Sequence, residues 1–348
     1  MESPFKRIAR NLYISQKKLL VKLGILFVKS IRPNLILAYD ASTVRDGVGA
    51  QIHRILSLSL VSYLFNLRMT RPRIEDITIH PLDPIQDPNS LRSHLADWNG
   101  HLFSSKQYTD PTGEVNSDSN EYFSSLKLRN LIILSIKAKL SKSSITIHTR
   151  EAHSISDYCV EEYRVAISHY FNEFLQFLEL QKRNFEIIVH YRQGSGAFAI
   201  HPGQSIPRQV SIDSVICAIE NISSLSMKKI KAMRLFTDSP KEPFVYSPIQ
   251  SQLYLWKDMP GFDGKSVTNQ SSGVEKCLLP IAEHKNLSFV VDREIDAFQM
   301  IVAMAKSEVL VMSRSSLSYV GALFNPDGEV FYPNNFWHTK LKKWHTYK

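Results

Sequence analysis

Apolar and polar positions alternate along the chain in blocks whose lengths predict strands and helices. "NLILAYD" at 34–40 and "FEIIVHY" at 185–191 are short, nearly continuous apolar runs, a pattern typical of buried strands. After the second run the blocks alternate regularly. Further strands are expected at 233–238, 287–292, 308–313 and 329–332, with helices near 211–222 and 295–305 between them. This alternation predicts an α/β fold built on a parallel, doubly wound sheet.

The N-terminal half has a less regular pattern. A glycine-containing loop and a long apolar helix at 51–67 are expected after the first strand, and "DITIHPLDP" at 76–84 predicts another strand. Residues 87–120 are rich in Ser, Asn and Asp, so we expect loops with short helices there. The remaining expectations are apolar, β-branched, strand-like runs at 128–136 and 143–149 and one long aromatic-rich helix at 156–180.

The start of the chain predicts a basic amphipathic helix. Its segment "KKLLVKLGILFVKSIRP" places apolar side chains at helical spacing between lysines: Leu19, Leu20, Leu23, Leu26 and Phe27. The apolar run is shorter than the roughly 20 residues of a membrane span, and Lys22 interrupts it. Two interpretations stand: adhesion to an anionic bilayer surface, or a helix packed on the domain with its lysines in solvent.

The length of the chain indicates how many domains it forms, and its charge indicates what kind of partner it binds. The 348 residues, 43% of them hydrophobic, divide into an N-terminal arm (1–33), an N-terminal lobe (34–183) and a C-terminal Rossmann-like lobe (184–348). The formal net charge of +9 indicates a polyanionic partner, which is a nucleic acid, an anionic membrane or a phosphorylated substrate. Much of the excess lies in the first 32 residues, where eight Lys and Arg face the single acid Glu2.

Three isolated cysteines, Cys159, Cys217 and Cys277, show neither a CxxC pattern nor a Cys/His metal spacing. We expect them to be reduced thiols, which favours a cytoplasmic location. No metal site is predicted.

A glycine-containing loop lies between the first strand and the first long apolar helix, in "RDGVGAQIHRI" (45–55). Gly47 and Gly49 would allow backbone amides and a helix N-terminus to approach an anion. The loop lacks the third glycine of a dinucleotide fingerprint and the GK[ST] of a P-loop, which excludes both assignments. A plain tight turn is the alternative.

Polar side chains gather where the C-terminal strands end. "HYRQGSG" places His190 and Arg192 after a buried strand, and arginine is well shaped for bidentate contact with a diphosphate. Asp238 follows another strand in "LFTDSP" and would accept hydrogen bonds from a guanine edge. A helix, a strand and a serine-rich turn occupy 296–324, forming a candidate phosphate cradle at a helix N-terminus. In each case an ordinary strand exit or helix cap is the alternative.

Taken together and in this order, these stretches resemble the fucosyltransferase superfamily that includes α-1,2-, α-1,6- and protein O-fucosyltransferases. "DGVGAQIHR" is similar to its "GGLGNQ" loop, with Gly47, Gly49 and Gln51 matching. "HYRQGSG" resembles "HxRxG", "FTDSP" resembles "TDDP", and "SRSSLSYVGALF" resembles "NSSFSWWGA". The resemblance runs from about residue 35 to residue 331, but only these short blocks are specific.

The resemblance implies a GT-B-like architecture, in which two Rossmann-like lobes face a central cleft, and inverting transfer of fucose from GDP-fucose without a metal or other cofactor. It implies that Arg192 binds the diphosphate and stabilises the departing GDP. The donor-binding residues that it implies are Gly47, Gly49, Gln51, His190, Arg192, Asp238, Asp296, Ser315 and Ser316. Asp46, beside the glycine loop, is a hypothetical general base.

The chain departs from the family pattern where a second arginine and an acid are common, because Gln193 and Ser195 stand there. From the resemblance we expect an α-fucosyltransferase that acts on a glycan or lipid-linked oligosaccharide. We also expect the basic arm to contact an anionic membrane, and we expect no nucleic acid partner. The alternatives are a basic nucleic-acid-binding protein and a degenerate homologue that binds GDP-sugar or glycan without turnover.

Overall fold

The computed structural model describes residues 4–41, 47–74, 88–109, 117–192, 210–237, 244–247, 252–255, 273–293 and 295–347. The chain forms two compact units. The first comprises Met1–Ile77 and Leu95–Phe177, and the second comprises Thr78–His94 and Leu178–Lys348.

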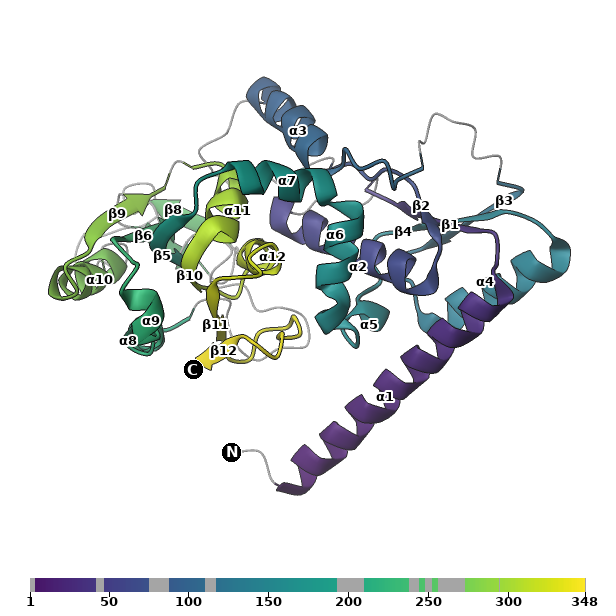
Figure 1. The fold of residues 1–348 in the computed structure, drawn as a ribbon, viewed down its shortest axis with the longest axis horizontal. Coiled ribbons are helices and arrows are strands. Elements are labelled where there is room, and N and C mark those ends of the chain that lie inside the picture. The colour runs from purple at the N-terminus through teal and green to yellow at the C-terminus, as the bar shows by residue number, and fades with distance from the viewer. Residues whose placement is uncertain are drawn as a thin grey trace. The chain divides into compact units, whose positions relative to one another are not determined.

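The first unit is built on a parallel sheet. In its described residues four strands lie in the order β2-β1-β4-β3, and their bounds are Arg68–Met69 (β2), Leu35–Tyr39 (β1), Ile145–Thr149 (β4) and Ser119–Phe123 (β3). The chain passes from β1 to β2 on one side and later returns to place β4 on the other side of β1 (Figure 1). The carboxyl ends of β1 and β4 therefore meet where the strand order reverses.

The helices of this unit are α1 (Pro4–Ile31), α2 (Val48–Phe65), α4 (Leu128–Ser141), α5 (His153–Ser156), the 3₁₀ turn η1 (Val160–Glu162) and α6 (Tyr163–Tyr170), together with the larger parts of α3 (Pro88–Leu102) and α7 (Asn172–Leu180). Helix α2 is buried along most of its length and packs on α6 and α5. It is also the one helix in the described part of the chain that is long and apolar enough to cross a membrane. Because most of it is buried in the unit, α2 is a core helix.

The second unit contains, in its described residues, a six-stranded parallel sheet of order β12-β11-β10-β5-β6-β9. The strands are β5 (Asn184–Tyr191), β6 (Ala232–Thr237), β9 (Ser288–Asp292), β10 (Ser307–Val311), β11 (Glu329–Pro333) and β12 (His345–Tyr347). A short antiparallel hairpin, β7 (Phe244–Ser247) and β8 (Gln252–Leu255), follows β6. Numbered from β5, the parallel sheet has the 3-2-1-4-5-6 order of a Rossmann fold.

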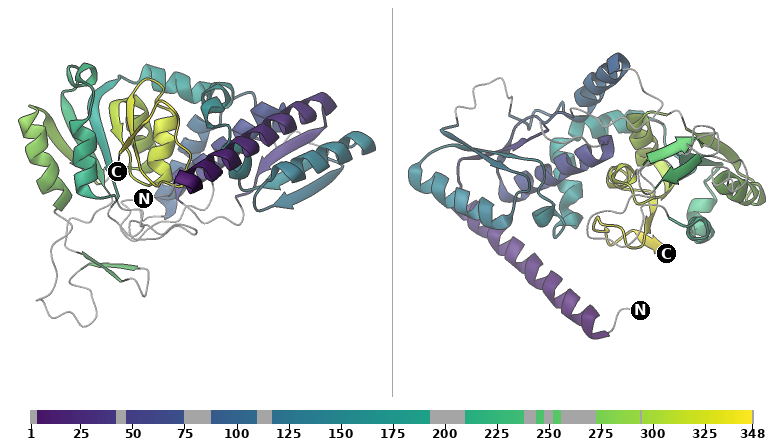
Figure 2. Two further views of the ribbon diagram at one scale, coloured as in Figure 1. Left: turned by 90° about the horizontal axis from the view of Figure 1, so that it is seen from below. Right: turned by 180° about the vertical axis from the view of Figure 1, so that it is seen from behind.

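Helices cover both faces of this sheet (Figure 2). They are α8 (Ile212–Glu220), α9 (Ser224–Met227), α10 (Gly273–His284), α11 (Ala297–Lys306) and α12 (Ser316–Leu323). Alternate residues of β5, Ile187, Val189 and Tyr191, join the core formed with α8 and α10. Because side chains alternate along a strand, Ile188 and His190 point to the opposite face, against which α11 packs.

The α/β class and the parallel strands predicted from the apolar runs of the C-terminal half are confirmed. The first strand, at β1, is also confirmed, and the N-terminal helix extends to 28 residues. The expected strand at 76–84 lies outside the described residues. Within the polar stretch 87–120, the structure has a helix of 15 residues, α3.

Two expectations for the first unit are wrong. Residues 128–136 belong to helix α4, whose buried residues, Leu131, Leu134, Ser135 and Ala138, recur at the helical spacing of three to four. The long helix expected at 156–180 is divided into η1, α6 and α7. The division at Phe171 allows this ring and the adjacent Tyr170 to be buried together, whereas neighbouring positions of a continuous helix point about 100° apart.

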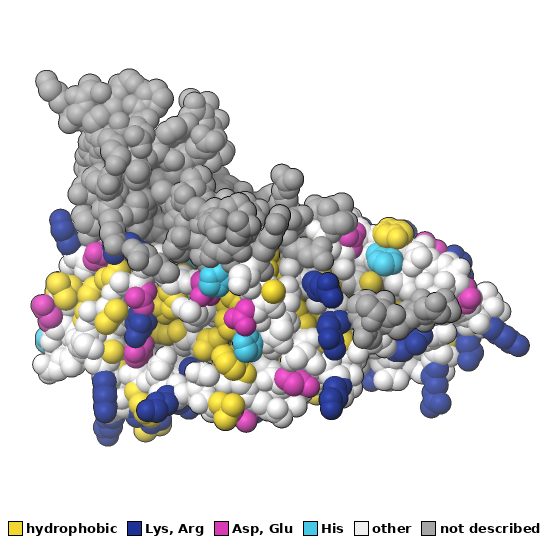
Figure 3. All heavy atoms as spheres, turned by 90° about the horizontal axis from the view of Figure 1, so that it is seen from above, with side chains coloured by type: hydrophobic (Ala, Val, Ile, Leu, Met, Phe, Trp, Pro, Cys, Tyr) yellow, Lys and Arg dark blue, Asp and Glu magenta, His cyan; other side chains and the backbone are white. Residues whose placement is uncertain are grey.

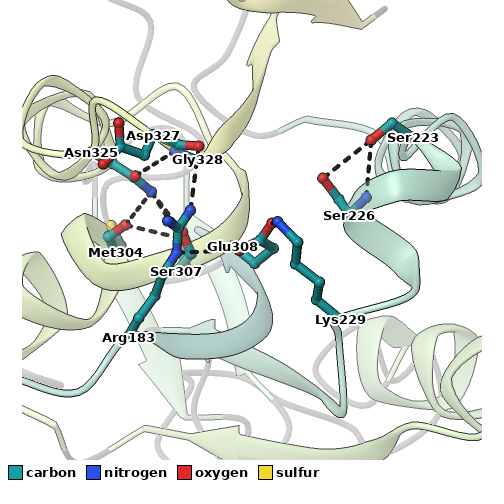
Figure 4. A network of polar contacts seen from close by, with 10 residues as sticks. All are labelled: Arg183, Ser223, Ser226, Lys229, Met304, Ser307, Glu308, Asn325, Asp327 and Gly328. Atoms are coloured by element: carbon teal, nitrogen blue, oxygen red, sulfur yellow. Dashed lines mark hydrogen bonds and ion pairs between the residues drawn. The ribbon is translucent and has the colours of Figure 1, made fainter.

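Buried polar groups tie the turns of the second unit together (Figure 4). Glu308 at the start of β10 is buried and forms ion pairs with Arg183 and Lys229. Asn325 donates to the carbonyl oxygens of Met304 and Ser307 and accepts from the backbone of Gly328 at 2.8 Å (Figure 4). These contacts fix the start of β10 and the turn that enters β11.

Helices α11 and α12 pack so closely that a glycine is needed between them. A Cβ atom at Gly321 would lie 2.6 Å from Cβ of Met304. We predict that Gly321→Ala lowers the free energy of unfolding by about 1–3 kcal/mol because of overpacking. Gly100→Ala in α3 is the matched control, because a Cβ there meets nothing within 4 Å and alanine favours a helix by up to about 1 kcal/mol. Urea unfolding measures both, and equal effects would contradict the packing argument.

Candidate functional site

The second sheet has a single reversal of strand order in its described part, between β5 and β10. From β5 the chain continues to β6 and β9, and then crosses to place β10 on the other side of β5. Helices that follow these strands leave in opposite directions from this point, which opens a crevice at the carboxyl ends. The residues after β5 and β10 are therefore placed together by topology alone.

His190 and Ser313 meet at this reversal. The imidazole Nδ1 of His190 lies 3.0 Å from the hydroxyl of Ser313, and both side chains are buried. His190 is the penultimate residue of β5, and Ser313 follows β10 by two residues. This hydrogen bond joins the ends of the two strands across the point where the strand order reverses.

The turn after β10 leads directly into α12. Ser315 is the N-cap of this helix, and its hydroxyl accepts from the backbone N–H of Leu317 at 3.3 Å. Ser318 donates to the carbonyl oxygens of Ser313 and Ser315. The first N–H groups of a helix lack intrahelical partners and favour anions, so this turn presents a helix N-terminus at the sheet edge.

A C-terminal segment packs around this turn. The hydroxyl of Ser316 lies 2.9 Å from Nε2 of His338, and the guanidinium of Arg314 donates to the carbonyl of Asn334 at 3.1 Å. Burial lowers the pKa of Arg314. The ring of Tyr319 packs edge-on against Trp344. The serine turn is thus held by side chains as well as by the cap.

Arg192 follows β5 directly and is half-buried. Its guanidinium brings a permanent positive charge to the edge of the sheet that carries His190 and the N-terminus of α12. Because a cation and a helix N-terminus both favour negative charge, this edge is suited to an anion such as a phosphate group.

The structure assigns the other predicted site residues to different surroundings. Asp296 caps α11, because its carboxylate accepts from the N–H groups of Phe298 and Gln299 at 2.8 and 2.9 Å. Gly47 and Gly49 belong to the first unit, where Gly47 precedes α2 in an extended conformation with open space around its Cα. Asp46 and Asp238 lie outside the described residues.

Gln51 is fully buried within α2. The donor-binding role that the resemblance implies for Gln51 stays a prediction.

The first unit has a polar cluster at its own strand reversal. The rings of His53 and His153 stack with centroids 4.5 Å apart, and Nε of Arg54 lies 3.7 Å from a carboxylate oxygen of Glu151. Ser57 accepts from the backbone N–H of Ala152 at 3.1 Å. These contacts join the first turns of α2, after the glycine loop, to the segment that follows β4.

Burial shifts the proton affinities in this cluster. The pKa of His153 is lowered to about 4, first by burial and then by Arg54, so the imidazole is neutral at pH 7. The pKa of Asp157 is raised to about 7, first by burial and then by the nearby Glu151. Perturbed carboxyl groups of this kind are candidates for proton transfer as well as for structural roles.

None of the residues in this cluster is among those that the sequence motifs predict for the site. His53 and Arg54 lie in the segment 45–55 that contains the glycine loop. Glu151 and His153 follow the strand-like run at 143–149. The same signal that identified His190 and Arg192, polar residues after an apolar strand, could have found Glu151 and His153. The described residues contain no group of three or more His, Cys, Asp or Glu arranged to hold a metal ion.

Comparison with known proteins gives only distant likenesses. The chain matches no protein-family model and no curated protein. Among solved structures, it is similar to POFUT1 in complex with GDP-fucose, with 10% identity, a TM-score of 0.42 and coverage of 86% of this chain and 98% of that chain. It is also similar to the E. coli heptosyltransferase WaaC with ADP, with 9% identity, a TM-score of 0.34 and coverage of 90% and 92%.

The raised pKa of Asp157 makes stability depend on pH. The native state keeps this proton up to about pH 7, whereas the unfolded chain releases it near its ordinary pKa, so native stability falls as pH rises between about 4 and 7. We predict that Asp157→Asn stabilises the protein by about 2 kcal/mol more at pH 8 than at pH 5. Thermal or urea unfolding at both values measures this difference. Asp213→Asn, at the exposed first turn of α8, is the control, and an equal change with pH in both variants would refute the assignment.

Proposed function

We propose that the protein is a glycosyltransferase that takes its sugar from a nucleoside diphosphate donor, and that this donor is GDP-fucose. The observation that carries the proposal is the contact between His190 and Ser313 at the reversal of a Rossmann-ordered sheet, with Arg192 and the N-terminus of α12 at the same edge. The choice of GDP-fucose rests on the four motifs that resemble the fucosyltransferase superfamily.

The chemistry required of this edge is the stabilisation of a departing diphosphate. In an inverting transfer, an acceptor hydroxyl forms a new bond to the anomeric carbon from one face while the bond to the diphosphate oxygen breaks on the other. The electron pair leaves with the GDP, whose oxygens gain negative charge. Arg192 and the N–H groups at the start of α12 would neutralise that charge, a role that a divalent ion has in other transferases.

Each polar residue of the edge has a separate task in this proposal. Arg192 contacts the diphosphate, and the turn containing Ser315 and Ser316 directs the N–H groups of α12 toward it. Ser313 would fix the orientation of His190, and His190 would contact the nucleotide. Asp238 is proposed, on the resemblance alone, to bind the guanine edge.

The acceptor side is proposed for the first unit. The acceptor is a glycan or lipid-linked oligosaccharide, and its hydroxyl proton passes to a carboxylate. Asp46 remains the hypothesis from the sequence, and Glu151, close to Arg54 and His153, is a second candidate. The three free cysteines support the proposed cytoplasmic location.

The face of the molecule drawn in Figure 3 does not favour a nucleic-acid partner. On the face drawn in Figure 3, Lys and Arg side chains occur at several separate places, with acidic and hydrophobic side chains between them. A nucleic-acid footprint requires basic groups clustered along one face. Part of the excess positive charge lies in α1, which has seven Lys and Arg residues and no acidic residue.

Arg192 provides the direct test of the donor site. We predict that GDP binds to the wild type in the presence of a chelator and more tightly than UDP, and that Arg192→Ala weakens GDP binding at least tenfold because a charge-assisted contact is lost. Isothermal calorimetry measures the affinities. The control is Arg164→Ala, an exposed arginine of α6, which should bind GDP as the wild type does. A folded wild type that binds no GDP would overturn the proposal.

Ser313 tests the positioning of His190. We predict that Ser313→Ala weakens GDP binding by about fivefold to tenfold, which corresponds to the net free energy of about 1 kcal/mol for one hydrogen bond. Ser135→Ala is a matched control, because Ser135 is equally buried but donates within α4 of the first unit. Equal affinity in both variants would show that the contact between Ser313 and His190 is structural only. Circular dichroism checks that each variant is folded.

A further inference from the structure

Helix α1 has two different apolar faces. The inner face contains Val21, Gly24 and Val28, which are buried, and α1 packs on α4 of the same unit. The contact is close, because a Cβ atom at Gly24 would lie 2.6 Å from a methyl carbon of Leu128. The helix is therefore attached to the first unit without using the apolar residues on its opposite side.

The outer face carries an apolar stripe in solvent. Its members are more than half exposed: Ile8 (59%), Leu12 (60%), Leu19 (58%), Leu23 (52%) and Leu26 (66%). They are separated by four, seven, four and three residues, which places them within about 60° of one another around a helix of 3.6 residues per turn. From Ile8 to Leu26 the stripe is about 27 Å long at 1.5 Å per residue.

Lysines border this stripe. Lys18, Lys22 and Lys29 are exposed and lie along one edge, also at helical spacing. The helix as a whole contains seven Lys and Arg residues and no acidic residue. Exposed leucines beside an all-positive edge are the pattern of a helix that lies in the plane of an anionic bilayer surface.

We propose that α1 docks the protein on a lipid bilayer containing anionic headgroups. The stripe from Ile8 to Leu26 enters the boundary between headgroups and acyl chains, while the lysines at its edge contact the anionic headgroups. This inference is independent of the proposed transferase activity, since it rests on the exposure and charge of α1 alone.

Charge distinguishes a bilayer from the other occupants of this face. A second copy of the chain would bring its own α1 lysines against Lys18, Lys22 and Lys29, and no acidic side chain of α1 would compensate them. A nucleic acid would match the charge but would leave the leucines in water. An anionic bilayer offers both an apolar layer and negative charge, and a lysine near such a surface is attracted to it.

The exposed face also separates the two interpretations of the N-terminal sequence. The helix does pack on the first unit, through Val21 and Val28, with its lysines in solvent, but Leu19, Leu23 and Leu26 stay exposed, so this packing does not account for the outer stripe. The seven basic residues keep α1 from being a transmembrane span, and it is not among the described helices that are apolar enough to cross a membrane.

The test is sedimentation of the full-length protein with vesicles of phosphatidylcholine alone or with 30% phosphatidylglycerol, at about 0.1 M salt. We expect binding to the anionic vesicles, and at least tenfold weaker binding for the triple variant Leu19→Ser, Leu23→Ser and Leu26→Ser. The control replaces two leucines elsewhere that are even more exposed, Leu140→Ser and Leu180→Ser, and should bind as the wild type does. A second variant, Lys18→Gln, Lys22→Gln and Lys29→Gln, should lose the preference for anionic lipid.

Other outcomes contradict the proposal. Equal binding of the triple variant and the wild type would show that the stripe is not the contact. Absence of vesicle binding, together with a dimer in light scattering that the leucine substitutions dissociate, would assign the face to a second copy. Circular dichroism and unaltered GDP affinity would show that the variants are folded, so failure of membrane binding is distinguishable from failure of the proposed function.

Discussion

The second unit depends on one topological constraint, the return of the chain across β5 to form β10. Because every strand of this sheet is parallel, each must be reached by a crossover, and the helices on either side of the reversal leave in opposite directions. The ends of β5 and β10 therefore lie at the kind of reversal where open α/β sheets bind ligands. The hydrogen bond between His190 and Ser313 joins these two ends, and Arg192 and α12 extend from them.

The buried polar groups around this point hold the two ends of β10 and the turns beside them in place. Glu308 with its two cations fixes the beginning of β10, while Asn325 fixes the turn between α12 and β11. At the other end of β10, Ser315 caps α12 and Ser316 contacts His338. Because β10 is short and held at both ends, the serine turn keeps a fixed position relative to the end of β5. Contacts that stabilise a charge developing during a reaction must be positioned in advance in this way.

The sequence alone predicted the second unit better than the first. β5 and β10 are apolar on both faces, so their lengths and the polar residues that follow them are visible as blocks in the chain. The aromatic residues of 156–180 are compatible with one helix or with several, and only packing decides that Phe171 lies between two. Strand β12 has three residues, too few for a pattern. The sequence also could not predict that Gln51 is buried, because the position of one polar residue in an apolar helix does not indicate whether it faces the core or the solvent.

The same limit applies to the candidate site. Local sequence identified His190, Arg192, Ser315 and Ser316 because they follow strands or precede a helix. It could not pair His190 with Ser313, which lies 123 residues away along the chain, nor bring Glu151 and Arg54 together across the first sheet. Those pairings come from strand order, which depends on contacts that are distant in sequence.

A crystal structure of the protein with GDP tests the account most directly. The account predicts that the diphosphate lies within hydrogen-bonding distance of the Arg192 guanidinium and of the backbone N–H groups at the start of α12. A well-ordered GDP bound away from the ends of β5 and β10 would contradict it.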